Sequence, residues 1–413
     1  MRKLWLQAHR WMALSLGWVL ILSGLTGATL VVLRPLDQWL HPELFVATGS
    51  GVADGAGDAA GNAARSPVTG RSLAGGGTPG TGVTLESLRA TLAREFGGQG
   101  NFSFRPPREP GETLQVLVRA GWRGTVYIDP VSGREQGRRG ENEGMVALLY
   151  GLHSALWLQQ TGKAILACVA GIYVLLMITG LVLWWPRKWP PTLRIELRKG
   201  LLRGLFDVHR TVGALLALAL CVSIATGAYL AWRPIGGWIT AASGASKVLA
   251  PKLPKLPMPM PLPMPSQSAG APASPEQSSA ADRGASPRQP LDALAASAQA
   301  AFPDGRIDLF LYTPHLDRPL VVRMHVPDDP HPNGRSTVWL DPRTGAVLGK
   351  VRWNDLDPGT RINSIVYPLH TGELGGVPLQ AAIATLGLAL ATLGISGLWL
   401  WLRRRSARRR SVV

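Results

Sequence analysis

The chain has 413 residues, of which 46% are hydrophobic and only 17% are charged. Soluble globular proteins carry about 25% charged residues, so this composition excludes most soluble enzymes and points to a membrane protein. The formal net charge is +17, and the two cysteines, Cys168 and Cys221, both lie in apolar runs. A structural disulfide is therefore not expected.

Four uncharged stretches are long enough to cross a bilayer, which takes about 20 apolar residues. They are Trp11–Leu33, Ala164–Trp185, Thr211–Trp232 and Leu374–Leu402. The first is longer than the apolar part of a signal peptide and is followed by three similar stretches, so it is predicted to be a retained span. The sequence thus predicts a multi-pass membrane protein.

The basic residues are concentrated at the N-terminus, between the second and third spans, and in the C-terminal tail. Together these segments hold 16 basic residues against Glu196 and Asp207, a net charge of +14 out of +17. Basic flanks remain cytoplasmic, so both termini are predicted on the cytoplasmic side of a bacterial inner membrane. The segments 34–160 and 233–365 are predicted in the periplasm. The high charge is thus a topology signal, and nucleic-acid binding is not expected.

The chain contains one unit written twice. Each copy has a histidine before its first span, a hydroxyl residue and a glycine near the end of that span, and the same two features at its second span. In the first copy these are His9, Thr26-Gly27, His153 and Thr179-Gly180, and in the second they are His209, Thr226-Gly227, His370 and Ser396-Gly397. The two hydroxyl–glycine pairs follow their histidines by 17 and 26 residues in both copies, which indicates an internal duplication.

An external module is predicted between the two spans of each copy. In the first, Leu85–Phe96 has helical spacing, and Leu114–Arg119 and Gly124–Ile128 alternate as strands do. In the second, the predicted helix is Leu291–Phe302, and the predicted strands are Ile307–Tyr312, Leu320–His325 and Ser336–Leu340. Gly- and Ala-rich or Pro-, Ser- and Ala-rich segments precede both modules and are predicted to be flexible linkers.

The predicted fold is a mainly α membrane protein, a bundle of four transmembrane helices from a duplicated unit, with two small α+β external modules. The expected division is a first span and outer edge (1–46), a linker (47–82), the first module (83–140), a second span with its outer histidine (141–186), a cytoplasmic loop (187–210), a third span and outer edge (211–245), a second linker (246–290), the second module (291–353), a fourth span with its outer histidine (354–402) and a basic tail (403–413).

These motifs resemble those of the PepSY-associated transmembrane proteins. The resemblance rests on the His-Arg pairs at His9 and His209, the Leu-His motifs at His153 and His370, the hydroxyl–glycine pairs, and the Asp-Pro-x-(Ser/Thr)-Gly turns at Asp129–Gly133 and Asp341–Gly345. It covers nearly the whole chain except the linkers. The resemblance implies four spans, external PepSY modules, haem b and electron delivery to iron(III) outside, as in the inner-membrane ferric-siderophore reductases of that family.

Four of the eight histidines lie at predicted membrane edges, where a titratable side chain is a functional hypothesis. His9 and His209 are expected at the cytoplasmic face, and His153 and His370 at the outer face. Two imidazoles on facing helices suit the axial positions of haem b, so two haems per chain are predicted. No Cys-x-x-Cys-His motif occurs, which excludes c-type attachment. Zinc or copper is the weaker alternative, because no carboxylate or thiolate joins either pair.

The predicted function is haem b-dependent electron transfer from the cytoplasmic side to an external acceptor, with reduction of ferric chelates such as siderophores for iron uptake. This would make the protein a metal oxidoreductase. No cytoplasmic segment is long enough for a flavin or nicotinamide domain, so the expected donor is a quinol or a separate cytoplasmic reductase. The alternative is a non-redox protein whose PepSY-like modules bind or restrain a partner, for example a protease, while its lipid-embedded spans only anchor them.

Three further groups of residues carry weaker expectations. Arg34 and Arg233 lie on the predicted outer side, against the charge rule, and are candidate contacts for haem propionates. The hydroxyl–glycine pairs are expected to allow close helix packing rather than to contact a ligand. A third group, His325, Asp328, Asp329 and His331, stands among prolines and is predicted to be a surface loop rather than a metal site.

The sequence leaves open how the outer histidines lie relative to the hydrocarbon of the membrane. His153 lies 11 residues before the second apolar stretch, and His370 lies four residues before the fourth. On straight helices both side chains would stand above the hydrocarbon. Strong tilt, protrusion, or helix breaks at Gly162 and at Gly375-Gly376 are the alternatives that the sequence leaves open.

Overall fold

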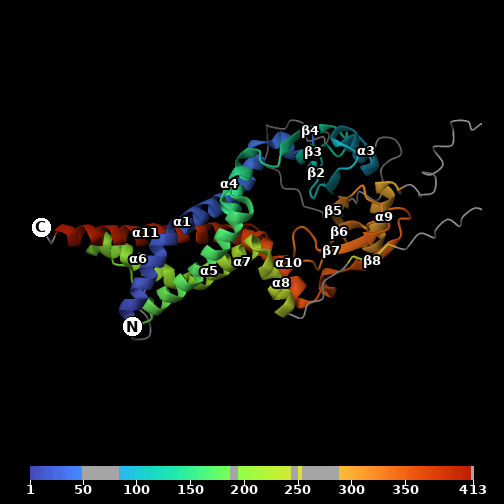
Figure 1. Cartoon of the computed structure of the whole chain (residues 1–413). Coiled ribbons are helices and arrows are strands. Elements are labelled where there is room, and N and C mark those ends of the chain that lie inside the picture. Colours follow the sequence, from blue (N-terminus) through green and yellow to red (C-terminus); the bar gives the residue numbers. More distant parts are fainter. Residues whose placement is uncertain (49–82, 187–193, 243–249, 254–287, 411–413) are drawn as a thin grey trace, which may run out of the picture.

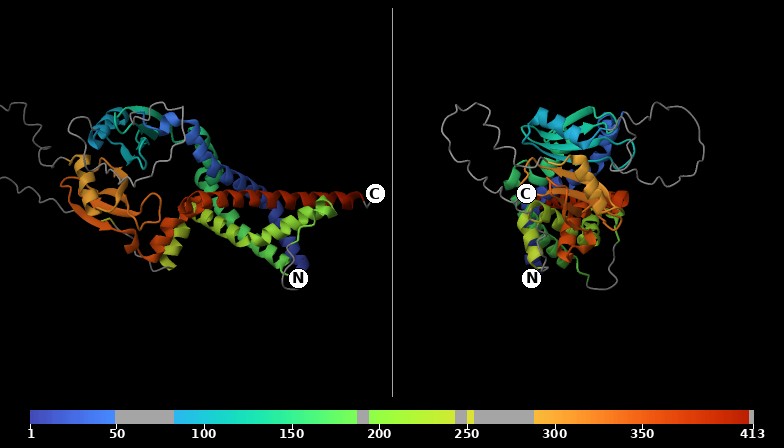
Figure 2. Two further views of the ribbon diagram at one scale, coloured as in Figure 1. Left: turned by 180° about the vertical axis from the view of Figure 1, so that it is seen from behind. Right: turned by 90° about the vertical axis from the view of Figure 1, so that its right-hand side faces the viewer.

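The computed structural model describes residues 1–48, 83–186, 194–242, 250–253 and 288–410. The two predicted linkers, 47–82 and 246–290, lie almost wholly outside these residues, as does the beginning of the predicted cytoplasmic loop. The described part consists of a helical bundle and a β-sheet with two covering helices (Figure 1). Helix α1 begins, and α11 ends, at the end of the bundle away from the sheet (Figure 2). We call this the termini end and the opposite one the sheet end.

The bundle supplies the membrane-spanning part. Among the described residues, three helices are long and apolar enough to cross a membrane, and the number rises to four if a bent pair counts as one span. The three are α1 (Arg2–Leu40), α5 (Gln159–Trp184) and α11 (Gly376–Arg410), and the bent pair is α6 (Leu201–Leu215) with α7 (Ala217–Ala231). The axis turns by 66° within this pair, so the third span is not the single straight helix that its apolar run predicts.

Two short helices at the sheet end carry the two histidines that are predicted on the outer side. Helix α4 (Gly144–Ala155) carries His153 and is separated from α5 by a break at which Leu156, Trp157 and Gln159 have positive φ. The expected break at Gly162 is therefore misplaced. Gly162 instead lets α5 touch α4, because a Cβ added there would lie 1.7 Å from the Ala155 carbonyl oxygen.

In the second copy, glycines form the corresponding helix break. Helix α10 (Pro358–Thr371) carries His370 and ends at Gly372, whose φ is 81°. A 3₁₀ turn (Glu373–Gly375) follows, and α11 begins at Gly376 with a φ of 61°. Left-handed backbone of this kind favours glycine, since other residues pay a steric penalty there. The break expected around Gly375-Gly376 is thus present.

The bundle closes around an apolar core and a tight helix crossing. A Cβ added to Gly24 of α1 would lie 2.5 Å from the carbonyl oxygen of Gly387 in α11, and the reverse substitution gives 2.6 Å. Only glycine allows two backbones to approach so closely. The core between the two ends contains mainly Val, Leu and Met side chains, among them Val19, Leu20, Leu176, Met177, Leu220, Leu390 and Leu393. The first and last long helices are therefore locked together.

The two predicted modules are not separate, because they share one sheet. The strands are β1 (Asn101–Arg105), β2 (Leu114–Arg119), β3 (Arg123–Ile128), β4 (Glu135–Gly140), β5 (Arg306–Tyr312), β6 (Leu320–His325), β7 (Ser336–Leu340) and β8 (Val347–Val351). Their order is β4-β3-β2-β1-β5-β6-β7-β8, with every neighbouring pair antiparallel. Strands β1 and β5 join the copies by pairing Phe102 with Tyr312 and Phe104 with Phe310.

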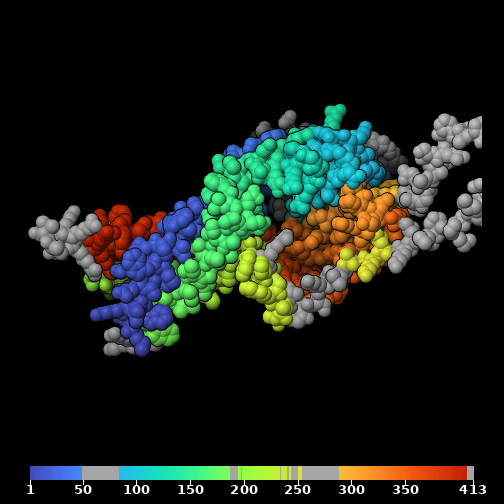
Figure 3. Space-filling view, viewed as in Figure 1, coloured from blue at the N-terminus to red at the C-terminus, as the bar shows by residue number. Residues whose placement is uncertain are grey.

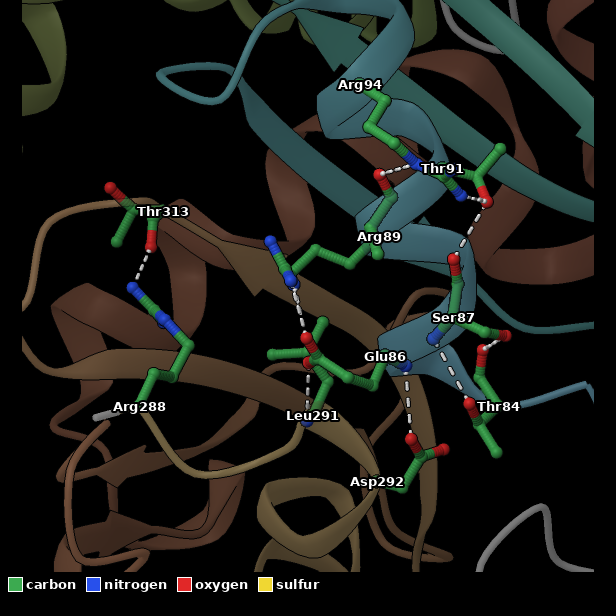
Figure 4. A network of polar contacts seen from close by, with 11 residues as sticks. Thr84, Glu86, Ser87, Arg89, Thr91, Arg94, Arg288, Leu291, Asp292 and Thr313 are labelled. Atoms are coloured by element: carbon green, nitrogen blue, oxygen red, sulfur yellow. Dashed lines mark hydrogen bonds and ion pairs between the residues drawn. The ribbon is translucent and has the colours of Figure 1, made fainter.

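Helices α3 (Leu85–Phe96) and α9 (Leu291–Ala301) cover one face of this sheet and share its core with Phe102, Phe104 and Phe310. Each helix also caps the other. The Asp292 carboxylate accepts hydrogen bonds from the backbone nitrogens of Leu85 (2.8 Å) and Glu86 (3.1 Å), and the Glu86 carboxylate accepts one from Leu291 (3.1 Å) (Figure 4). Carboxylates stabilise helix N-termini, so this exchange fixes the two copies to each other.

Short connections attach the sheet to the bundle. Helix α2 (Pro42–Phe45) follows α1, and Arg139 of β4 forms an ion pair of 2.6 Å with Asp37 near the end of α1. In the second copy, α8 (Arg233–Ala242) follows α7, and the 3₁₀ turn Trp353–Asp355 leads from β8 into α10. The sheet is therefore held beside the helices that carry the outer histidines.

Candidate functional site

The four predicted histidines form two pairs at opposite ends of the bundle. His9 of α1 and His209 of α6 have ring centroids 6.3 Å apart, with an angle of 87° between the ring planes. His153 of α4 and His370 of α10 have centroids 6.2 Å apart, with an angle of 33°. We call them the termini-side pair and the sheet-side pair. Each pair takes one histidine from each copy of the repeat.

A hydroxyl group from a facing helix contacts every one of these rings at Nδ1. The distances are 2.9 Å for His9–Thr179, 3.0 Å for His153–Thr26, 3.0 Å for His370–Thr226 and 3.2 Å for His209–Ser396. Each hydroxyl also donates its own hydrogen to a carbonyl of its helix. It must then accept the hydrogen bond from the ring, so Nδ1 carries the ring proton.

Backbone carbonyls give the same assignment for three of the rings. The Nδ1 atoms of His9, His209 and His370 lie 3.2, 3.1 and 3.1 Å from the carbonyl oxygens of Leu176, Leu393 and Ser223. A carbonyl can only accept, so Nδ1 must donate. In a neutral imidazole the lone pair is then on Nε2, which is the tautomer that a metal ligand needs.

The glycine of each hydroxyl–glycine pair makes room for the same ring. A Cβ added to Gly27 would lie 2.9 Å from Cε1 of His153, and one added to Gly227 would lie 3.1 Å from Cε1 of His370. At the termini end, Gly180 and Gly397 stand in the same relation to His9 and His209, at 3.3 Å each. The close helix packing expected of these dipeptides thus takes place at the four histidines.

The donor set fits a haem better than a bare metal ion. Two imidazoles that coordinate one metal from opposite sides through bonds of about 2 Å have ring centroids roughly 6 Å apart. Within the described ranges, no group of three or more His, Cys, Asp or Glu side chains could hold a metal ion, whereas a structural zinc site takes four protein ligands. A haem needs only two axial ligands from the protein, because the porphyrin supplies the other four.

Arg34 and Arg233 were the two residues expected to contact haem propionates. The Arg34 guanidinium lies 2.7 Å from the Glu373 carboxylate and 3.0 Å from the Tyr367 hydroxyl, so it is already paired within the chain. Tyr367 precedes His370 by one helical turn, and Arg34 thus ties α1 of the first copy to the histidine helix of the second. Arg233 begins α8, and its side chain lies outside the part that the structure describes.

One acid beside the termini-side pair is buried, which its place in a basic segment did not predict. Asp207 of α6 stands two residues before His209 and is fully buried. Its carboxylate accepts from Nε of Arg203 at 3.0 Å and lies 3.9 Å from Arg210. A lone Asp among the basic residues of this segment was the available signal. These ion pairs lie within α6 and stabilise the helical turn that carries His209, while the backbone nitrogen of Glu196 donates to the Asp207 carboxylate at 3.3 Å and ties the preceding segment to the helix.

The expected surface loop around His331 is only partly a surface feature. Asp328 pairs with Arg352 at 2.8 Å, whereas Asp329 is buried and accepts hydrogen bonds from the backbone nitrogens of His331 (3.0 Å) and Ser336 (3.1 Å). His331 itself is buried, with 1% of its surface exposed. The aspartates therefore organise a turn, and the described part of the chain holds no metal cluster there.

The model of the PepSY-associated TM region matches residues 6–404. The chain belongs to this family. The match spans both copies of the repeat in this PepSY-associated membrane protein, including all four histidines and the eight-stranded sheet. A search among curated proteins finds no significant match.

Proposed function

We propose that this PepSY-associated protein binds one haem b at each histidine pair and carries electrons across the membrane to an acceptor on the sheet side. The observation that carries the proposal is the shared geometry of the four rings. Every Nδ1 is bound by a hydroxyl of a facing helix, and the rings meet in pairs 6.2 and 6.3 Å apart. Bound haem would supply one-electron carriers within the bundle.

The chain's own residues orient the ligands and exclude water. Hydroxyl groups fix the tautomer of the rings, and the neighbouring glycines set how closely each helix approaches its histidine. The apolar core between the pairs excludes water from the centre of the bundle. Such an environment favours a neutral imidazole ligand and an electron carrier shielded from solvent.

Charge supports the direction of transfer. Helix α1 begins and α11 ends at the same end of the bundle (Figure 2), and the chain segments at this end hold 16 basic residues against only Glu196 and Asp207. Basic flanks remain in the cytoplasm, so the termini-side pair faces the reductant in a bacterial inner membrane and the sheet faces the periplasm. The donor is a membrane quinol or a separate cytoplasmic reductase. The acceptor we propose is a ferric chelate, such as a siderophore, which would make the protein a ferric-chelate oxidoreductase.

The test starts with stoichiometry. A pyridine haemochrome assay on the purified protein should give two haem b per chain, and a colourless protein would favour the non-redox anchor. In vesicles of known orientation reduced from the termini side, external ferric chelates should reoxidise the haems and yield iron(II) for a ferrous-specific dye. Haems that stay reduced with a range of chelates would overturn the iron assignment alone.

A further inference from the structure

The end of the sheet that faces the bundle gathers charged residues from neighbouring strands. We call the following set the basic cluster: Arg108 after β1, Asp308 in β5, Arg323 in β6, His331 in the loop between β6 and β7, and Arg335 just before β7. Antiparallel register brings these strand ends together, since Ile307 pairs with Met324 and Met324 pairs with Ser336. The cluster therefore combines residues of both copies.

Arg323 and Arg335 form no ion pair with the two nearby acids, Asp308 and Asp329, although both acids lie within electrostatic range of them. Asp308 forms its ion pair with Arg108, at 3.1 Å, and Asp329 is occupied by backbone nitrogens of the β6–β7 loop. The side chain of Arg323 makes no hydrogen bond or ion pair with any residue that the structure describes. The Nε atom of Arg335 is buried and has no hydrogen-bond partner there either.

These guanidinium groups also repel each other. Burial, followed by the nearby charge of Arg323, lowers the pKa of Arg335 to about 10. Burial lowers the pKa of Arg323 as well. Both groups remain charged at neutral pH, so two partly buried cations stand side by side. An anion bound between them would relieve the repulsion and restore the hydrogen bonds that burial removes.

The contact between Arg335 and His331 is a second place where a donor of Arg335 lacks an acceptor. Nδ1 of His331 accepts a hydrogen bond from the backbone nitrogen of Asn333 at 3.0 Å, so the neutral ring carries its proton on Nε2. Burial and the neighbouring arginines lower the pKa of His331 to about 3, which keeps the ring neutral. Nη2 of Arg335 lies 2.9 Å from Nε2, and two donors thus face each other. Arg335 gains by turning towards an acceptor.

The basic cluster stands next to the sheet-side pair. Arg335 lies within electrostatic range of Tyr229 in α7, and Tyr229 follows Thr226 by one helical turn. Thr226 is the residue whose hydroxyl binds His370. The loop between β6 and β7, orange in Figure 1, reaches towards this end of α7. In the space-filling view the surface is hollowed between α4 and the orange strands (Figure 3).

We propose that Arg323 and Arg335 bind the carboxylate groups of an anionic, oxygen-rich ferric chelate, and so hold it beside the sheet-side histidine pair. This inference rests on the proposed function, since it assigns the charge class of its acceptor. Guanidinium groups bind carboxylates through paired, charge-assisted hydrogen bonds, which suits them to a polycarboxylate chelate. A neutral chelate would gain nothing from the two charges.

The test measures binding of ferric citrate to the full chain in phosphatidylcholine nanodiscs by calorimetry. Arg323→Gln and Arg335→Gln should each weaken binding by roughly ten- to a hundredfold, since each removes a charge-assisted hydrogen-bond donor. Arg335→Lys keeps the charge but not the fork and should lose part of the affinity. Arg318→Gln is the matched control, because this exposed residue lies in the loop at the other end of β5 and β6. It should bind as the wild type does.

Several outcomes would overturn the site. One is wild-type affinity in both glutamine variants whose haem content and melting temperature are normal. Another is equal binding of an uncharged ferric trihydroxamate that shows the same dependence on the arginines. A third is displacement of citrate by phosphatidylglycerol in the nanodisc, which would assign the arginines to a lipid headgroup. A colourless protein that still binds citrate through these arginines would support the anion site while the haem proposal fails.

Discussion

The Nδ1 atom of His153 lies 3.0 Å from the hydroxyl of Thr26, which stands 17 residues after His9 on the same long helix. At 1.5 Å per residue, α1 places the two histidine sites about 25 Å apart. One helix thus supplies a ligand at one end of the bundle and supports a ligand at the other. The second copy repeats this relation with His209, Thr226 and His370.

Because the pairs are so far apart, their cofactors should be separable. His9→Ala should remove the termini-side haem and spare the other, and His153→Ala should do the reverse. The measurement is the haem ratio together with the split of the low-temperature absorption bands. His315→Ala, at an exposed position in the sheet region, should change neither component. Loss of the same spectral component in both variants would show that the pairing is wrong.

Removal of one hydroxyl tests the support of the ring. Thr26→Val keeps the shape but removes the hydroxyl acceptor of His153, so only the backbone hydrogen bond with Ser23 remains to orient the ring. Outer-shell partners of this kind are worth about 10- to 100-fold in affinity, and we expect a loss of that size for the sheet-side haem. Its midpoint potential should shift as well. Thr29→Val is the control, because the Thr29 hydroxyl bonds only the Leu25 carbonyl of its own helix. Thr26→Ser should restore the wild-type behaviour.

A single methyl group at Gly27 should push against the ring of His153 and displace it. Gly27→Ala places a Cβ 2.9 Å from Cε1 of His153, closer than atoms in contact tolerate. We expect reduced sheet-side haem and an altered spectrum of the remainder. Gly171→Ala introduces the same methyl where no neighbour lies within 4 Å, and alanine is the better helix former, so stability should be equal or higher. Equal haem content in the two variants would contradict the assigned role of Gly27.

The exchange of helix caps between the copies should contribute to stability without affecting the cofactors. Asp292→Ala removes the acceptor for the backbone nitrogens of Leu85 and Glu86, at a cost of about 1 kcal/mol or somewhat more. Thermal unfolding of the sheet region should shift to lower temperature, with haem content unchanged. Asp317→Ala, at an exposed position, should leave the transition where it is. A large loss of haem in Asp292→Ala would mean that the sheet also shapes the sheet-side site.

Much of the candidate site could be predicted from spacing alone. The equal offsets of 17 and 26 residues in both copies already identify each histidine and each hydroxyl–glycine pair as parts of one repeat. At the fixed rise of a helix these two offsets differ by about 13 Å, so only the helix breaks after α4 and α10 bring His153 and His370 level with Thr26 and Thr226. The sequence offered no reason to connect the two, because both features are small and packing is the common use of such dipeptides. The hydrogen bonds at Nδ1 of His9 and His153 depend on how α1 packs against α5 and α4, which only the tertiary structure shows.

The sheet has features that the local sequence pattern does not predict. Strand β4 reads Glu-Gln-Gly-Arg-Arg-Gly and has no apolar alternation, so its pairing with β3 is its only reason to be extended. The union of both modules depends on the pairing of β1 with β5, which are about 200 residues apart. Neither the basic cluster nor the exchanged caps could be inferred before this pairing was known.

By itself, the sequence determined the membrane class, the apolar runs, the duplication and the four histidines, because hydropathy, charge and helical rise act along the chain. The tertiary structure alone decided which hydroxyl contacts each ring, that Leu156–Leu158 rather than Gly162 breaks the second span, and that Arg34 pairs with Glu373. These are contacts between residues far apart in the sequence, and their geometry depends on how whole helices pack, which no local pattern specifies.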